Sequence, residues 1–211
     1  MIIVFARAPV LGQAKTRLVP RLGEWRAARL HERLTRHALR IARQTSEAVE
    51  LHGTRRHSFF RDLGVPFRLQ RGGELGERMY RALSRARKPA ILIGTDCPAL
   101  TVADLRRAAR SLHGGQDVVL APAEDGGYAL IGVKRPKREW FEGIEWGSAR
   151  VYEQTVKKLE GHRWRALRRV WDVDRPADLE RLRSLRFASA FRQASRRSAD
   201  SHAHWGGSGR P

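Results

Sequence analysis

The sequence predicts an α/β fold with three layers, α/β/α, around a mostly parallel sheet. Short apolar runs alternate along the chain with amphipathic stretches of helical length, which is typical of βαβ units. The clearest strand is "AILIG" at 90–94, and "RAARLHERLTRHALRIAR" at 26–43 is an amphipathic helix. At 211 residues, 41% of them hydrophobic, the chain can bury one substantial core.

The remaining elements are predicted from the same two patterns, short apolar runs for strands and amphipathic stretches for helices. Strands are expected in the short apolar runs at 2–6, 49–51, 65–70, 90–94, 117–122 and 128–133. Helices are expected in the amphipathic stretches at about 24–49, 75–87, 102–112 and 149–159, with a last helix after Pro176. Between the last two helices, "RWRALRRVW" at 163–171 is an apolar and basic run that we assign to neither class.

The composition of the chain changes near its end. Residues 1–186 are expected to form the folded domain, and 187–211 a basic tail rich in serine, glycine and arginine. Such a segment lacks the apolar residues that ordering requires, so we expect it to be disordered. We interpret His202 and His204 in this tail as an incidental pair and not as a metal site.

The net charge is strongly positive, with 42 basic and 22 acidic residues giving +20. This balance is typical of proteins that meet phosphates, nucleic acid or an anionic surface. However, many arginines surround the apolar stripes of expected helices, so we interpret most of the charge as solvated surface. The sequence has no zinc-ligand spacing, helix-turn-helix pattern or interleaved aromatic and basic residues, and therefore does not favour nucleic-acid binding.

The sequence contains no targeting or membrane segment. The first apolar run starts after one residue and lacks a basic region and a cleavage site. No run approaches the roughly 18 apolar residues that a membrane span needs. The single cysteine, Cys97, cannot form an internal disulfide. We therefore expect a cytoplasmic protein that does not bind membranes.

The segment after the first strand is the first candidate for chemistry, because ligands of open α/β sheets bind at the carboxyl ends of the strands. "RAPVLGQAKTRL" at 7–18 combines Pro9 and Gly12 with Lys15 and Arg17. Such a loop could wrap a polyphosphate with backbone N–H groups and neutralise it with the two cations. The spacing is not that of a P-loop, and a generic basic loop explains it equally well.

A carboxylate ends the clearest strand, in the sequence Thr95-Asp96-Cys97-Pro98. Beside a phosphate site, Asp96 could share Mg²⁺ or Mn²⁺ with the phosphates. Alternatively, Thr95 or Asp96 starts a turn that Pro98 stiffens. We interpret Cys97 as a small buried residue and not as a nucleophile.

A pair of glycines precedes the strand at 128–133, in "EDGGYALIG". Gly126 and Gly127 allow a close approach of the backbone to a ligand, and Asp125-Gly126 is also a strong turn signal. Tyr128 alternates with Leu130 on the expected strand, which indicates core packing.

Two further carboxylates, Asp172 and Asp174, end the apolar run at 163–171. Either residue could cap the helix that Pro176 opens, Asp174 being nearer, or could be a second ligand for a cation.

Together, these motifs resemble the DUF2064 family of uncharacterised transferases. The motifs, in chain order, are "FARAPVLGQAKTRL", "GGELGERM", "IGTDCPAL", "APAEDGGYALIGV", "WGSARV" and "DVDRPADL". The family belongs to the nucleotide-diphospho-sugar transferase superfamily, whose members share the Rossmann-like glycosyltransferase-A fold. The resemblance covers about residues 1–185 and leaves out the tail.

The resemblance implies roles for particular residues. Lys15 and Arg17 would bind nucleotide phosphates, with Arg7 at the start of the same loop. Asp96 matches the metal aspartate of sugar-phosphate nucleotidyltransferases, so Lys15 and Asp96 are the expected catalytic residues. Asp174 falls where those enzymes keep a second metal ligand.

Two other segments also have expected roles. Asp125, Gly126 and Gly127 resemble the loop that those nucleotidyltransferases press against the sugar or acceptor. Glu77 and Arg78 in "LGERM" could reach the nucleotide or acceptor, or could only hold the loop that starts their helix.

The sequence departs from the family pattern at several positions. Leu11 stands where a proline is frequent, and Glu74 where an aspartate is common. "WGSAR" replaces a serine or threonine pair, so we interpret Ser148 as a cap of the next helix. The strand-end motif also lacks the Asp-x-Asp with which many sugar transferases hold a metal.

Two reactions fit these motifs, nucleotidyl transfer from an NTP and glycosyl transfer from a nucleotide sugar. In both, a nucleotide or nucleotide-sugar donor and a small-molecule acceptor would bind with Mg²⁺ or Mn²⁺. The first is favoured by the Lys15 and Arg17 loop and the missing Asp-x-Asp, and the second by the family label. The alternatives outside enzymes are an inactive nucleotide-binding module and a basic nucleic-acid-binding protein.

Overall fold

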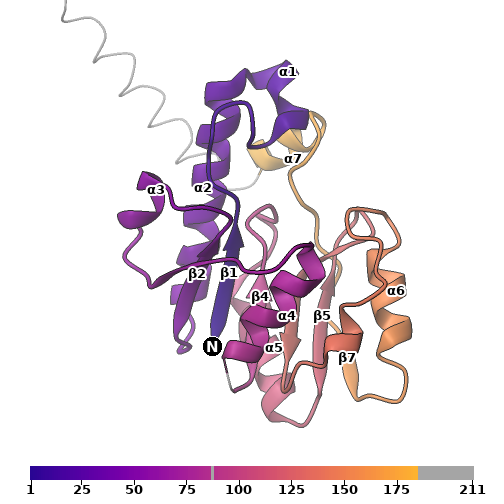
Figure 1. Ribbon diagram of the computed structural model, residues 1–211. Helices are drawn as coiled ribbons and strands as arrows, with labels where there is room; N and C mark the ends of the chain where they lie inside the picture. The colour runs from indigo at the N-terminus through magenta and orange to yellow at the C-terminus, as the bar shows by residue number, and fades with distance from the viewer. Residues whose placement is uncertain (87, 185–211) are drawn as a thin grey trace, which may run out of the picture. The chain divides into compact units, whose positions relative to one another are not determined.

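A computed structural model describes residues 1–86 and 88–184 of the chain (Figure 1). It contains two compact units, one comprising Met1–Asp174 and the other beginning at Arg175. The proposed domain boundary at 186 and the tail at 187–211, with its two histidines, lie outside the described residues. No helix in the described ranges is both long and apolar enough to cross a membrane.

The first unit is built on a seven-stranded sheet with the strand order β3-β2-β1-β4-β6-β5-β7. The strands are β1 (Ile2–Ala6), β2 (Val49–Gly53), β3 (Phe67–Leu69), β4 (Ala90–Ile93), β5 (Val118–Pro122), β6 (Tyr128–Val133) and β7 (Trp164–Ala166). Only β6 pairs antiparallel with its neighbours, β4 and β5. The prediction of an α/β fold with a mostly parallel sheet is therefore confirmed.

The helices also follow the predicted order. They are α1 (Val19–Leu22), α2 (Glu24–Arg43), α3 (Ser58–Arg61), α4 (Leu75–Arg85), α5 (Val102–His113), α6 (Val151–Lys158) and α7 (Asp178–Ser184), with 3-10 turns η1 (Thr16–Leu18) and η2 (Arg138–Trp140). The four-residue helices α1 and α3 were not predicted, because one turn is too short to show a periodicity.

The structure differs from the sequence interpretation at three notable points: the end of one helix, one additional strand and one helix cap. The first long helix, α2, ends at Arg43 and not at 49, because Val49 already pairs with Ile2 in the sheet. The unassigned run at 163–171 contains the edge strand β7. The capping role of Ser148 was wrong: its Oγ accepts a hydrogen bond from the N–H of Arg150, which is itself the N-cap of α6.

Alternate residues of the strands pack into two separate cores, one on each face of the sheet. From β1, Ile2 and Val4 pack with residues of α2 and α5. Ile3 and Phe5 pack on the other face, with residues of α4. Figure 1 shows α4 in front of the sheet and α2 behind it. Because both faces are covered, the strands β1, β4 and β5 are apolar and buried along their whole length, as expected for parallel sheets, and the three-layer prediction is confirmed.

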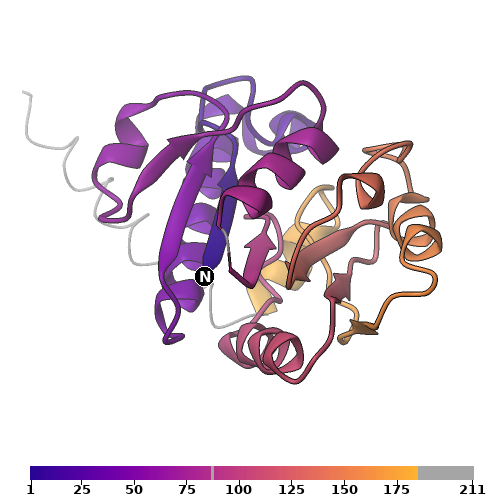
Figure 2. The same ribbon diagram turned by 60° about the horizontal axis from the view of Figure 1, so that its bottom comes forward.

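The strand order reverses direction between β1 and β4. From β1 the chain builds the sheet outward through β2 to β3, whereas β4 lies on the other side of β1. Figure 2 shows β2 at one side of this unit and α6 at the other. At such a switch point the loops after the two central strands diverge and leave a crevice for a ligand. Here these loops are 7–18 and 94–101.

A buried carboxylate, Asp104, fixes the start of α5, the helix that follows the β4 loop. Asp104 and Thr101 form a capping box, in which the side chain of each accepts a hydrogen bond from the backbone N–H of the other. The guanidinium of Arg168 also donates to Asp104, with Nε at 3.0 Å from Oδ1 and Nη2 at 2.7 Å from Oδ2. The same Nη2 is 2.6 Å from the carbonyl of Ala99. Asp104 therefore joins the β4–α5 loop to the segment after β7.

We predict that Asp104→Ala lowers the free energy of unfolding by about 3 kcal/mol, because the cap is lost and Arg168 loses its charged partner. Asp104→Asn keeps an acceptor for Thr101, so its loss should be smaller. Urea unfolding of the two variants and the wild type checks the order. An Asp104→Ala protein as stable as the wild type would contradict it.

Candidate active site

The loop after β1 places a lysine in a constrained backbone conformation. Among the described residues, Lys15 is the only one other than glycine with a positive φ, at 53°. This left-handed conformation costs a residue with a side chain on the order of 1 kcal/mol. Ala14 and Leu18 on either side are buried and hold the loop in place. Strain of this kind concentrates at functional sites, and here it fixes the direction of the Lys15 side chain.

The Lys15 side chain reaches the carboxylate at the end of β4. Its Nζ lies 2.9 Å from Oδ1 of Asp96, and the side chain is only 3% exposed. The ammonium also donates to the carbonyl of Val173. The structure therefore brings together, at the switch point, the two residues that the sequence predicted as catalytic.

Asp96 is ionised and accessible to solvent. Burial would raise the pKa of its carboxyl, but Lys15 and His31 outweigh burial and hold the pKa well below the usual range. The side chain is 52% exposed, in contrast to that of Lys15. A carboxylate that keeps its charge and faces solvent can bind a hard cation.

His31 on α2 is the member of the site that the sequence analysis missed. Its ring is 4% exposed, and Nδ1 lies 3.7 Å from Oδ1 of Asp96. Its Nε2 lies 2.9 Å from the carbonyl oxygen of Arg7. The available signal was a histidine on the apolar face of α2, beside Leu30 and Leu34. That position alone does not reveal a site, because only the fold packs α2 against β1, the strand that pairs with β4.

The two arginines of the first loop, Arg17 and Arg7, differ in their contacts. Arg17 forms a salt bridge with Asp174, which was predicted as the second metal ligand. A cation could use Asp174 only if this pair opens. The side chain of Arg7 is exposed, while its backbone carbonyl accepts from His31.

Glu77 and Arg78 hold the start of α4. Oε2 of Glu77 accepts from the N–H of Gly73 at 2.8 Å, and Oε1 pairs with Arg81. Nη1 of Arg78 donates to Gln70 at 3.2 Å. The amide of Gln70 in turn donates to the carbonyl of His52 at 2.9 Å. The loop-holding interpretation of Glu77 therefore accounts for its contacts, and Arg78 is tied to the end of β2.

The double glycine forms the turn between β5 and β6. Gly126 has φ +90°, and a Cβ there would lie 2.0 Å from the carbonyl oxygen of Ala149. Its own carbonyl accepts from Tyr152 at 2.8 Å. The N–H of Gly127 binds the side chain of Asp125 at 2.9 Å. The close approach that requires Gly126 is thus to the chain's own backbone.

The segment 171–174 lies beside the β4 loop. The thiol of Cys97 donates to the carbonyl of Trp171 at 3.0 Å, and the N–H of Val173 donates to the carbonyl of Asp96 at 2.8 Å. Burial raises the pKa of Cys97 to about 12, so the thiol is unreactive at neutral pH, as expected for a structural cysteine. Burial also raises the pKa of Asp172 to about 6, and the charge of Asp125 adds to this rise.

No three histidine, cysteine, aspartate or glutamate side chains within 1–86 and 88–184 lie close enough together to form a metal site. A cation would therefore need ligands from outside the protein, and nucleotide phosphates can supply them. The protein's part of such a site would be Asp96 and its immediate neighbours.

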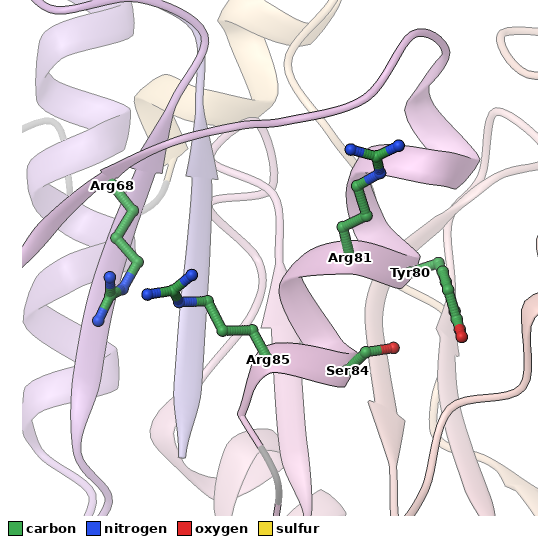
Figure 3. Close-up of a pocket in the computed structure, with 5 residues that line it drawn as sticks. All are labelled: Arg68, Tyr80, Arg81, Ser84 and Arg85. Atoms are coloured by element: carbon green, nitrogen blue, oxygen red, sulfur yellow. The ribbon is translucent and has the colours of Figure 1, made fainter.

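A separate cavity of about 630 Å³ lies on β3 and α4 and includes neither Lys15, Asp96 nor His31. Its lining is Arg68, Tyr80, Arg81, Ser84 and Arg85. Figure 3 shows the guanidinium groups of Arg68 and Arg85 close to each other. Arg68 and Arg81 already pair with Glu50 and Glu77. We assign this cavity no part in the chemistry.

The comparison with protein families gives one match. A family described as "Uncharacterized protein conserved in bacteria (DUF2064)" matches residues 33–148. A comparison with curated proteins found no match.

Solved structures show the same fold. A Desulfovibrio desulfuricans G20 protein, provisionally described as a nucleotide-diphospho-sugar transferase, is 28% identical, with a TM-score of 0.83 over 92% of this chain and 94% of that one. CMP:2-keto-3-deoxy-manno-octonic acid synthetase complexed with CTP is 13% identical, with a TM-score of 0.60 over 88% and 97% of the two chains. A Bacillus anthracis protein, provisionally described as a glucose-1-phosphate thymidylyltransferase, is 14% identical, with a TM-score of 0.55 over 87% and 94%. The last two are similar in fold alone.

The two glycines of the β5–β6 turn should respond differently to substitution. Gly126→Ala should lower the free energy of unfolding by about 3 kcal/mol, because the new Cβ needs a positive φ and collides with Ala149. Gly127→Ala is the matched control, since its Cβ would meet only the Asp125 side chain, at 3.2 Å. Urea unfolding measures both. Equal losses would contradict the close approach at Gly126.

Asp172 should make the protein less stable as the pH rises. Its folded pKa of about 6 lies above the ordinary value of 3.8. The stabilising contribution of the protonated carboxyl is therefore complete below 3.8 and is lost as the pH rises through about 6. Asp172→Asn cannot ionise, so its Tm should exceed that of the wild type by a few degrees, about 3 °C, at high pH.

Thermal unfolding of both proteins across this range tests the expectation. The difference in Tm should grow from acid to alkaline pH. A difference that stays constant with pH would exclude the raised pKa.

Proposed function

The chain belongs to the DUF2064 family and has the fold of the nucleotide-diphospho-sugar transferase superfamily, and from this premise we propose that it is a metal-dependent transferase acting on a nucleotide. The observation that carries this proposal is the contact between Lys15 and Asp96 at the strand-order switch. A basic side chain that could bind phosphates thus meets a carboxylate that could bind a metal, at the edge of the sheet where ligands of open α/β folds bind.

Lys15 and Arg17 are the proposed phosphate-binding residues. The Lys15 ammonium has little conformational freedom because its backbone and its Asp96 contact fix it. Arg17 is 66% exposed, so its guanidinium can turn toward a ligand. Two fixed or nearby cations stabilise charge that grows on phosphate oxygens in the transition state.

Asp96 is the proposed metal ligand, and its low pKa and solvent exposure fit this role. A divalent cation bound there would neutralise phosphate charge that the two basic side chains alone cannot neutralise. Asp174 remains the proposed second carboxylate, available once Arg17 moves to the nucleotide. Mg²⁺ and Mn²⁺ are the candidates, because both accept oxygen ligands.

Nucleotidyl transfer is the reaction that the site supports best. An acceptor oxygen attacks the α-phosphorus of an NTP, the bond from that phosphorus to the bridging oxygen breaks, and pyrophosphate leaves. In an Asp-x-Asp motif the second carboxylate would stand two residues from Asp96, where this chain has Gly94 and Pro98. This strand end therefore cannot supply the second carboxylate found in Asp-x-Asp sites.

Glycosyl transfer is the second candidate. It is favoured by the similarity to the Desulfovibrio protein described as a nucleotide-diphospho-sugar transferase. The same side chains would then stabilise a nucleoside diphosphate leaving group while the acceptor attacks the sugar carbon. The two reactions differ in product, since the first releases pyrophosphate and the second a nucleoside diphosphate.

The acceptor is proposed to bind at the β5–β6 turn. Asp125 is held there by the N–H of Gly127, and its charge influences Asp172 across the same edge. Arg7, directly after β1, and Arg78, on α4, complete the group of cations proposed to face the nucleotide. A small molecule with a phosphate or hydroxyl nucleophile fits this arrangement.

We predict that an NTP or a nucleotide sugar raises the Tm of the wild type in the presence of Mn²⁺ by several degrees, about 4 °C at saturating ligand. Asp96→Asn should reduce this metal-dependent rise to near zero, because the amide cannot bind the cation as a carboxylate does. Asp62→Asn, at an exposed aspartate outside the site, is the matched control and should respond as the wild type. A thermal-shift screen of NTPs and nucleotide sugars with and without Mn²⁺ makes the measurement.

Asp96→Asn is preferred to Asp96→Ala, because it keeps the volume of the side chain and an acceptor for Lys15. If no nucleotide stabilises the wild type, the proposed function is wrong. An Asp96→Asn protein that retains the metal-dependent rise would rule out Asp96 as the ligand.

A further inference from the structure

His31 presents an unused nitrogen to the carboxylate of Asp96. Among the described residues, Nδ1 of His31 has no hydrogen-bond partner, although the atom is buried. Unpaired buried polar atoms are rare in folded proteins and call for an explanation. The other ring nitrogen is satisfied, so the ring is not merely misplaced.

The partner of Nε2 determines the state of Nδ1. A carbonyl oxygen can only accept, so the contact of Nε2 with the Arg7 carbonyl requires a proton on Nε2. In the neutral ring, Nδ1 then carries a lone pair that faces Oδ1 of Asp96. Two electron-rich atoms that face each other are repulsive unless a positive centre, either a proton on Nδ1 or a metal ion, lies between them.

The separation of the two atoms suits a shared cation better than a hydrogen bond. At 3.7 Å, Nδ1 and Oδ1 are too far apart for a hydrogen bond. Two ligand atoms that each bind one metal ion at about 2.1 Å lie roughly 3–4 Å apart. Histidines that bind metals also typically donate their second N–H to a backbone carbonyl or a carboxylate. The Arg7 carbonyl already provides that partner.

We propose that His31, through Nδ1, is a nitrogen ligand of the divalent cation that Asp96 binds. This inference rests on the proposed function, because it concerns the same cation. His31 and Asp96 supply one nitrogen and one carboxylate oxygen. Asp174 can add a second carboxylate once Arg17 moves to the nucleotide, and nucleotide phosphates supply the remaining ligands. Because only two side chains, those of His31 and Asp96, face the proposed cation before Arg17 moves, no group of three ligating side chains is found within the described ranges.

An imidazole ligand makes the site selective among metals. Mg²⁺ prefers an all-oxygen environment, whereas nitrogen ligands favour the later first-row ions. The site should therefore prefer Mn²⁺ or Co²⁺ to Mg²⁺. This distinguishes it from a site made only of carboxylates.

Lys15 couples this cation to the nucleotide. The Lys15 ammonium and Nδ1 of His31 both approach the same oxygen, Oδ1 of Asp96. In the absence of phosphates, the ammonium competes with a metal for that oxygen. A bound nucleotide gives the ammonium another partner, so the metal should bind more tightly in its presence.

Pulsed electron paramagnetic resonance of Mn²⁺ tests this ligand directly, because a bonded imidazole nitrogen couples to the electron spin of the metal. The samples are the full chain with Mn²⁺ alone and with Mn²⁺ and each NTP. The Mn²⁺ dissociation constant is measured on the same samples from the signal of free Mn²⁺. The variants are His31→Gln and, as matched control, His37→Gln on the same helix.

His31→Gln keeps an N–H at the position of Nε2 for the Arg7 carbonyl while removing Nδ1. The wild type and His37→Gln should show the nitrogen coupling, and His31→Gln should lose it. The affinity for Mn²⁺ should fall by at least about tenfold in His31→Gln, since even the loss of an outer hydrogen-bond partner costs this much. The thermal unfolding of each variant shows whether it is folded.

The failure of this inference differs from the failure of the proposed function. Mn²⁺ that binds through Asp96 without nitrogen coupling, or with coupling that persists in His31→Gln, overturns the role of His31 and leaves the function intact. If His31→Gln does not fold, loss of the coupling in His31→Asn with retained Mn²⁺ binding supports the role, since asparagine offers an oxygen near Nδ1. Mn²⁺ binding that is insensitive to Asp96→Asn overturns both.

Discussion

The ammonium of Lys15 is buried, and a buried charge must be paired. Removing an unpaired ammonium from water costs several kcal/mol, so the loop after β1 folds as it does only because Asp96 and the Val173 carbonyl receive this side chain. The left-handed backbone of Lys15 is part of the same constraint. One contact thus joins the first strand, the fourth strand and the segment after the last strand.

The segment after β7 completes this edge of the sheet. It is held by backbone and side-chain contacts to the β4 loop, through Trp171, Val173 and Arg168. These contacts are independent of the Lys15 charge, and Asp104 anchors them from below. This edge of the sheet is therefore supported by contacts that do not involve the Lys15–Asp96 ion pair, so Lys15 could change partners while these contacts remain.

The charges at this edge oppose the charge of the whole protein. The chain carries +20, yet Asp96, Asp125, Asp172 and Asp174 all lie in loops of this edge. The charges of Asp125 and Asp174 add to the rise in the pKa of Asp172 that burial causes. The positive surface attracts anionic nucleotides over distance, whereas the carboxylates would repel them at contact. Under the proposed function, a divalent cation would resolve this conflict, because it would bind both the carboxylates and the phosphates.

From the sequence alone, the fold class, the order of the elements and most of the strand-end residues could be predicted. Local periodicity and turn residues encode these features, as the runs at 2–6 and 90–94 and the Asp125-Gly126 turn show. Which of those residues meet follows only from the tertiary structure. Lys15 contacts Asp96 across 81 positions because β1 pairs with β4, and His31 joins them because α2 packs against β1. Such contacts depend on strand order and helix packing, and neither can be predicted from a local sequence pattern.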